Sequence, residues 1–142
     1  MMATMERISS GIAVLLICTA ILAQQPKTDK AAGRCQKNAD LVGQCFGFHG
    51  RAFLSNGTPS LRIWPVGTNR ILGVTQHPKA DDAEDPIAPA NLLNALGGFD
   101  HFVFGDFEVC PLTPKRPGWM QMVCVERAKN LAIKPYGYRT QD

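Results

Sequence analysis

Two arginines, a histidine and a tryptophan stand at alternate positions in two neighbouring segments of this chain. His49 and Arg51 lie in the first segment, and Arg62 and Trp64 lie in the second. A guanidinium group matches the two oxygens of a carboxylate, and an indole ring offers a flat wall for stacking. If the segments pair as a hairpin, Arg51 faces Arg62, and two opposed arginines repel each other unless an anion lies between them. The pattern predicts a ligand-binding face for a small anion or carboxylate.

The alternative is that carboxylates of the protein itself neutralise these arginines. Asp106 and Glu108 share one face of a later segment, and residues 81–85 form an acidic run. Surface ion pairs are common and arginine side chains have a long reach, so this interpretation needs no ligand.

Catalytic and metal-binding patterns are weaker. His49, His77 and His101 lack the local spacing of a zinc site, and the acidic run lacks the alternating ligands and central glycine of a calcium loop. No phosphate-binding loop or nucleophile elbow occurs. The sequence predicts no catalytic residue, no metal and no cofactor. The enzymatic alternative is a small hydrolase or transferase in which His49 or His101 acts with an acidic partner such as Asp106 inside a concave pocket.

Three predicted strands position the arginines. Residues 45–54 and 61–66 alternate with period two, and residues 70–75 supply the third strand. Asn56-Gly57 and Gly67-Thr68 are typical hairpin turns. With two-residue loops, Ala52 lies opposite Leu61, His49 lies opposite Trp64, and Ile63 lies opposite Leu72. Both turns then select one apolar face, which consists of Ala52, Leu54, Leu61, Ile63, Leu72 and Val74.

The rest of the chain predicts further strands and a short helix. Pro89 suits the start of a helix over residues 89–96, and Gly97-Gly98 suits its end. Residues 99–110 and 119–127 read as strands, with Trp119 as a core or partly buried strand residue. The predicted fold is mainly β: a small antiparallel sandwich or partly open barrel with one or two short helices.

The N-terminal segment has the features of an export signal. Residues 11–23 are apolar and uncharged, which is too short to span a bilayer comfortably, and Ala23 suits the position before a cleavage site. The alternative is an uncleaved anchor, which would be the only membrane contact. We therefore expect a signal peptide over residues 1–23, a flexible lead-in over 24–43 and a single β-rich domain over 44–138.

Cleavage would leave four cysteines, Cys35, Cys45, Cys110 and Cys124, of the five in the chain. An even number of cysteines in an exported chain indicates two disulfides. A hairpin through residues 111–118 would place Cys110 opposite Trp119, too far from Cys124 for a bond. At least one disulfide should therefore link the N-terminal half of the chain to the C-terminal half.

These observations favour an exported, non-enzymatic binding or interaction module of the cell envelope or extracellular space. A net charge of +3 without a stripe of basic residues argues against nucleic acid. The expected partner is a protein or a small anionic ligand. The alternatives are the histidine–carboxylate enzyme and a structural envelope component that self-associates through a strand edge.

Overall fold

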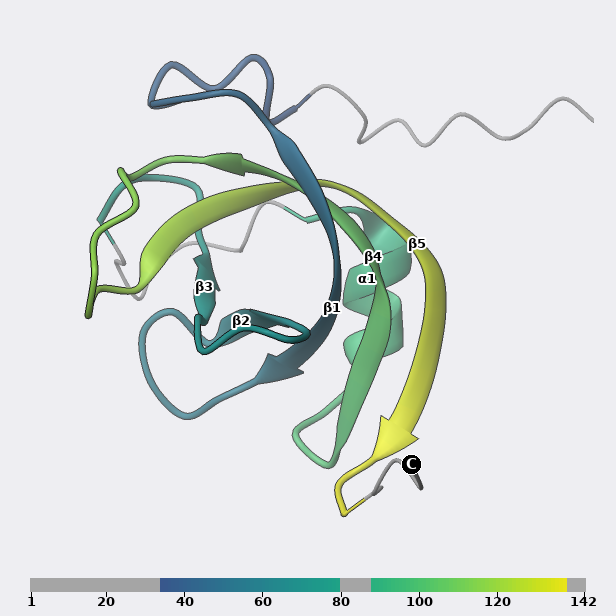
Figure 1. The fold of residues 1–142 in the computed structure, drawn as a ribbon. Helices are drawn as coiled ribbons and strands as arrows, with labels where there is room; N and C mark the ends of the chain where they lie inside the picture. Colours follow the sequence, from purple (N-terminus) through teal and green to yellow (C-terminus); the bar gives the residue numbers. More distant parts are fainter. Residues whose placement is uncertain (1–33, 80–87, 138–142) are drawn as a thin grey trace, which may run out of the picture.

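The computed structural model describes residues 34–79 and 88–137, which contain five strands and one helix (Figure 1). The strands are β1 (Phe46–Leu54), β2 (Leu61–Pro65), β3 (Leu72–Val74), β4 (His101–Pro111) and β5 (Gln121–Pro135), and the helix is α1 (Ala90–Leu96). The expected signal peptide (1–23), residues 24–33 of the lead-in, the acidic run (81–85) and residue 138 lie outside the described residues. No helix in the described ranges is long and apolar enough to cross a membrane.

The five strands form one mixed sheet that closes into a ring in the order β1-β2-β3-β5-β4. The mainly β fold with a short helix agrees with the sequence prediction. Four of the neighbouring pairs are antiparallel, as expected, whereas β3 and β5 are parallel. After β3, the chain crosses the ring so that the next strand, β4, pairs with β1 and not with β3. Both β3 and β5 run in the same direction as β1, because each is separated from β1 by one antiparallel neighbour, β2 and β4 respectively.

The second predicted turn has the predicted register, with Ile63 opposite Leu72. The first hairpin is shifted by two residues, so Ala52 lies opposite Ile63 rather than Leu61. Its loop spans residues 55–60 instead of two residues. Pro59 is buried in this loop and has no N–H for a strand ladder, so pairing begins after it. A shift of two residues keeps every side chain on its predicted face, because strands alternate with period two.

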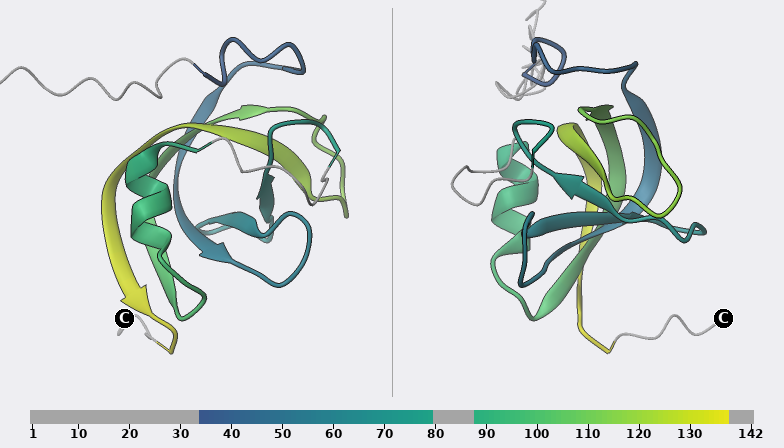
Figure 2. Two further views of the ribbon diagram at one scale, coloured as in Figure 1. Left: turned by 180° about the vertical axis from the view of Figure 1, so that it is seen from behind. Right: turned by 90° about the vertical axis from the view of Figure 1, so that its left-hand side faces the viewer.

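The predicted apolar face lines the interior of the ring. Five of its six members are almost fully buried, and Leu54 packs at the margin. Helix α1 starts after Pro89 and ends at Gly97, which has a positive φ of 39°, as the sequence predicts. Leu92 and Leu96 on α1 enter the same core. Figure 2 shows α1 lying along β4 and β5.

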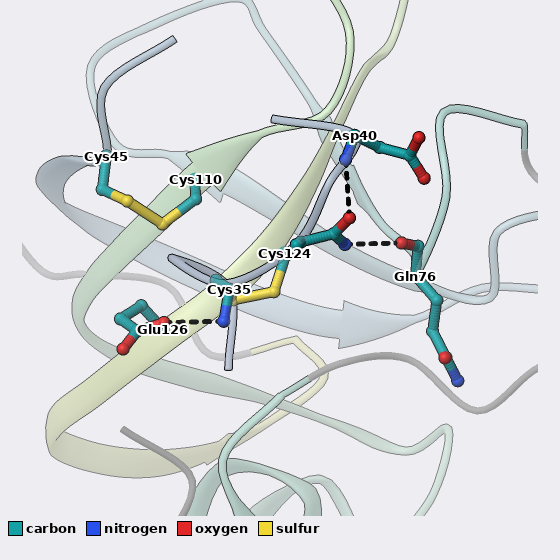
Figure 3. Close-up of a disulfide and its surroundings, with 8 residues drawn as sticks. Cys35, Asp40, Cys45, Gln76, Cys110, Cys124 and Glu126 are labelled. Atoms are coloured by element: carbon teal, nitrogen blue, oxygen red, sulfur yellow. Dashed lines mark hydrogen bonds between the residues drawn. A yellow bond between two sulfur atoms is a disulfide. The ribbon is translucent and has the colours of Figure 1, made fainter. Parts of the chain in front are cut away.

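Two disulfides fasten the segment before β1 to the β4–β5 pair (Figure 3). Cys35 is bonded to Cys124, and Cys45 is bonded to Cys110, so both bridges join the two halves of the chain. The prediction of at least one such bridge is confirmed. The register behind it was wrong, because Cys110 lies opposite Cys124 and not opposite Trp119. Residues 112–120 form the connecting loop, and Trp119 is 75% exposed rather than part of a strand or the core.

Candidate functional site

The four residues of the predicted ligand-binding face lie on the outside of the ring, but their cross-strand partners differ from the predicted ones. Arg51 lies opposite Trp64 in the β1–β2 ladder, and Arg62 lies opposite Phe53. The predicted opposition of two arginines is therefore wrong, and the reason is the longer hairpin loop. His49 lies next to β4 instead, opposite Asp106. The structure thus brings Arg51 and Trp64 together and assigns His49 to a separate group.

The guanidinium of Arg51 is stacked between aromatic rings. Its Cζ atom lies 4.6 Å from the centroid of the Trp64 ring and 4.2 Å from that of Phe102. Phe53 is further away, at 5.9 Å. Rings at such distances attract a cation through their quadrupole and restrict its movement. The Nε atom of Arg51 is buried without a hydrogen-bond partner, so only the terminal Nη groups remain for an incoming ligand.

Neither carboxylate that we considered as a partner for Arg51 contacts it. Asp106 accepts hydrogen bonds from His49 and Asn130, and Glu108 pairs with Arg127 at 2.9 Å. Neutralisation of Arg51 by these two acidic residues is therefore absent. The other acidic candidate, the run at 81–85, lies outside the described residues.

Local hydrogen bonds hold the remaining members of the face. The Trp64 indole Nε1 donates to the Thr68 carbonyl oxygen at 2.6 Å, which ties the ring to the β2–β3 turn. Arg62 Nε donates to the Pro59 carbonyl oxygen at 3.1 Å. Trp64 is therefore a fixed wall. Arg62 already donates a hydrogen bond to its own loop and is the weaker candidate for binding a ligand.

Sequence reasoning missed the aromatic residues of this surface. Phe102 packs edge-on against Phe53 and lies 4.4 Å, centroid to centroid, from Tyr136. Phe53 could have been found, because it lies two positions after Arg51 and so shares its face. Phe102 comes from a distant segment, and only the β1–β4 pairing brings it to Arg51. Tyr136 follows β5 and contacts Phe102.

His49 begins an exposed row of polar side chains across β1, β4 and β5. Its Nδ1 lies 2.9 Å from Asp106 Oδ1, and Asn130 Nδ2 donates to the other carboxylate oxygen at 2.6 Å. The hydrogen bond from Asn130, and then that from His49, lower the pKa of Asp106. The side chains of His49 and Asp106 are 57% and 51% exposed. Asp106 borders a shallow hollow on this surface, but His49 does not line it.

His101 joins the end of α1 to the start of β4. Its Nε2 lies 2.9 Å from the Ala95 carbonyl oxygen, and its Nδ1 lies 2.7 Å from Asp100 Oδ1. Both partners are acceptors, so the pair of contacts is satisfied only when both ring nitrogens carry a proton. The bond to Ala95, and then that to Asp100, raise the pKa of His101. His101 therefore lies beside the carboxylate of Asp100 rather than that of Asp106, and it lines neither the hollow beside Asp106 nor the groove beside Trp119.

One buried group has the composition of a metal site. The Sγ atoms of Cys35 and Cys110 and a carboxylate oxygen of Glu126 lie within 4.8 Å of one another. Metal binding requires thiolates, and both cysteines are engaged in disulfides. Glu126 instead accepts a hydrogen bond from the backbone N–H of Cys35 at 2.9 Å (Figure 3), which supports the N-terminal segment.

Comparison of the chain with protein-family models, with curated proteins and with solved structures finds no match. The arrangement of side chains is therefore the basis for any functional argument, since one architecture can carry many functions.

Proposed function

We propose that this protein is an exported, non-enzymatic binding module that captures an anionic group at Arg51. The observation that carries the proposal is the state of this guanidinium: it is stacked between Trp64 and Phe102 and has no carboxylate partner among the described residues. Because its position is already restricted, little side-chain freedom is lost when a ligand binds. The planar Nη edge suits a carboxylate or phosphate.

Export is supported by the cysteines. Two disulfides indicate an oxidising environment. That setting agrees with the apolar run at residues 11–23 and with a module of the cell envelope or the extracellular space.

The enzymatic alternative is favoured by two contacts, that of His49 with Asp106 and that of His101 with Asp100. Several features argue against it. The side chains of His49 and Asp106 are more than half exposed, and the nearby hollow does not include His49. Both ring nitrogens of His101 already have hydrogen-bond partners. All four cysteines in the described residues are in disulfides, so none supplies a thiolate nucleophile. Self-association through a strand edge could use the part of β5 after Val123, because β3 pairs with β5 only up to that residue.

The test uses the two tryptophans as separate reporters. Because the chain has only Trp64 and Trp119, a proton–nitrogen NMR spectrum contains two indole N–H signals, which the variant Trp119→Phe assigns. Benzoate is the probe, benzamide is its uncharged analogue, and inorganic phosphate tests the other class of anion. We expect benzoate or phosphate to shift the Trp64 signal saturably, and benzamide to leave it unchanged.

The variant Arg51→Gln should weaken this binding about tenfold or more, because a hydrogen bond to a charged group contributes about 1.5–3 kcal/mol. Arg116→Ala removes the same charge elsewhere and should have no effect on the Trp64 signal. Phe102→Leu keeps the charge of Arg51 but removes one stacking ring, and should weaken binding less. Equal binding by native protein and a folded Arg51→Gln variant would refute the proposal, as would the absence of a saturable shift with either anion.

A further inference from the structure

A second surface, separate from Arg51, combines cations with an exposed indole. It is a groove between the β2–β3 turn and the loop that connects β4 to β5. Its charged lining residues are Arg70, Lys115 and Arg116, and its apolar lining includes Ile71 and Trp119. No acidic residue lines it. Trp119 and Ile71 are 75% and 40% exposed and line the same groove, and apolar side chains grouped within a polar rim are typical of a contact surface.

The turn that carries Trp119 is rigid. The backbone N–H of Trp119 donates to the Arg116 carbonyl oxygen at 3.3 Å, which closes a four-residue turn. Pro117 occupies the second position, and Gly118 occupies the third with a φ of 76°. This combination is typical of a type II turn, since proline fixes its own φ and glycine accepts the positive one. The cation of Arg116 and the indole of Trp119 are therefore presented from the two ends of one fixed turn.

Arg70 is held on the opposite wall of the groove. Its Nη2 donates to Gln121 Oε1 at 2.6 Å. Gln121 is buried, and its Nε2 donates to the Thr113 carbonyl oxygen at 2.9 Å. A buried amide thus fixes Arg70 relative to the base of the loop that carries Lys115 and Arg116. None of these three cations forms an ion pair within residues 34–79 and 88–137.

We propose that this groove binds an acidic polysaccharide, with sugar carboxylates on the cations and a sugar ring against Trp119. The charge of the lining requires an anionic ligand. An indole face suits a flat ring with an apolar side, and a chain of acidic sugars provides such rings next to carboxylates. The groove does not include Arg51, so the two proposals can be tested separately.

Two observations favour a polysaccharide over other polyanions. A peptide can gain affinity by adding a strand to an open sheet edge, but β3 and the start of β5, which flank the groove, already pair with each other. A nucleic acid is a poor match for the oxidising environment that the two disulfides indicate. Acidic glycans occur in that environment and need no strand edge.

The experiment uses the full mature chain and a hexamer of galacturonic acid as the probe. Maltohexaose is the uncharged control, and a hexaglutamate peptide and a single-stranded hexanucleotide represent the competing classes. We expect the galacturonate hexamer to shift the Trp119 indole signal saturably while the Trp64 signal remains in place. Raising the salt concentration from 0.05 M to 0.5 M should weaken this binding, because exposed charges are screened.

The double variant Lys115→Ala/Arg116→Ala should bind the hexamer at least tenfold more weakly. Lys37→Ala/Lys129→Ala removes two exposed cations that do not line the groove, and should bind within twofold of the native protein. Trp119→Ala, whose binding is measured by titration calorimetry because the reporter signal is removed, should also lose at least tenfold, with unchanged thermal unfolding. The proposal is overturned if maltohexaose binds equally well, if the Lys115/Arg116 variant retains native affinity, or if Trp119 does not respond. Tighter binding of the peptide or the nucleotide would assign the groove to that class instead.

Discussion

The two disulfides should stabilise the fold in a coupled manner, because one closes a loop inside the other. Cys35–Cys124 spans 89 residues, and Cys45–Cys110 spans 65 residues within it. Ten residues separate Cys35 from Cys45, and fourteen separate Cys110 from Cys124. When one bridge is present, the other therefore closes a loop of only about 24 residues in the unfolded chain.

The chain-entropy relation gives the expected sizes. Closing a loop of about 24 residues contributes about 3.5 kcal/mol, whereas closing the full 89-residue loop contributes about 4.6 kcal/mol. Replacing Cys35 and Cys124 by alanine should thus cost about 3.5 kcal/mol while Cys45–Cys110 remains. The same replacement should cost about 1 kcal/mol more in a chain that already lacks Cys45–Cys110.

Urea unfolding of the native chain and of three alanine variants measures both costs. The variants lack the first bridge, the second bridge, or both, and all four proteins contain the same concentration of a stabilising osmolyte so that the last variant folds. Cavity effects cancel in the difference to the extent that they are the same in both backgrounds. Equal costs in the two backgrounds would refute the reasoning, because they would mean that the unfolded chain does not experience the nested loop.

Two further predictions concern the C-terminal end of α1 and the wall of the ring. The raised pKa of His101 should stabilise the fold fully below the ordinary pKa of 6.5, and this stabilisation should be lost as pH rises through the raised pKa. Between pH 5.5 and 9, the urea midpoint of the native chain should therefore fall relative to that of His101→Gln, and parallel curves would contradict this. Gly105→Ala should cost about 1–3 kcal/mol, because its Cβ would lie 2.9 Å from a backbone carbonyl oxygen. Gly47→Ala is the control, since its nearest neighbour lies at 3.7 Å, and an equal loss in thermal stability for both variants would disprove the steric explanation.

Local patterns in the sequence predicted much of this fold. Alternation fixed the inner face of β1, β2 and β3, and the register error of two residues did not change it, because a strand returns to the same face after two positions. Pro89 and Gly97 predicted the bounds of α1, since both act through their own backbone geometry. In contrast, the pairing of β1 with β4 and of β3 with β5 joins distant segments, and no local signal specifies it.

In the candidate site, too, the local features could be predicted and the contacts between distant strands could not. Arg51 and Trp64 were predicted to share a face, and they do. Their direct contact depends on the length of the 55–60 loop. The Asn56-Gly57 pattern predicted a loop of two residues, which is shorter than the loop in the structure. Phe102 could not be placed beside Arg51 without knowing that β4 follows β1 in the ring.

The distribution of charge explains why both proposed sites are basic. Each of the three histidines in the described residues contacts an aspartate, and Glu108 is used by Arg127. The fifth carboxylate of the described residues, Glu126, is buried and bonded to the backbone of Cys35. Of the other four carboxylates, three therefore contact histidines and one contacts an arginine. Among the described residues, Arg51 and Arg70 therefore have no acidic partner. Their lack of one agrees with the proposal that each binds an anion.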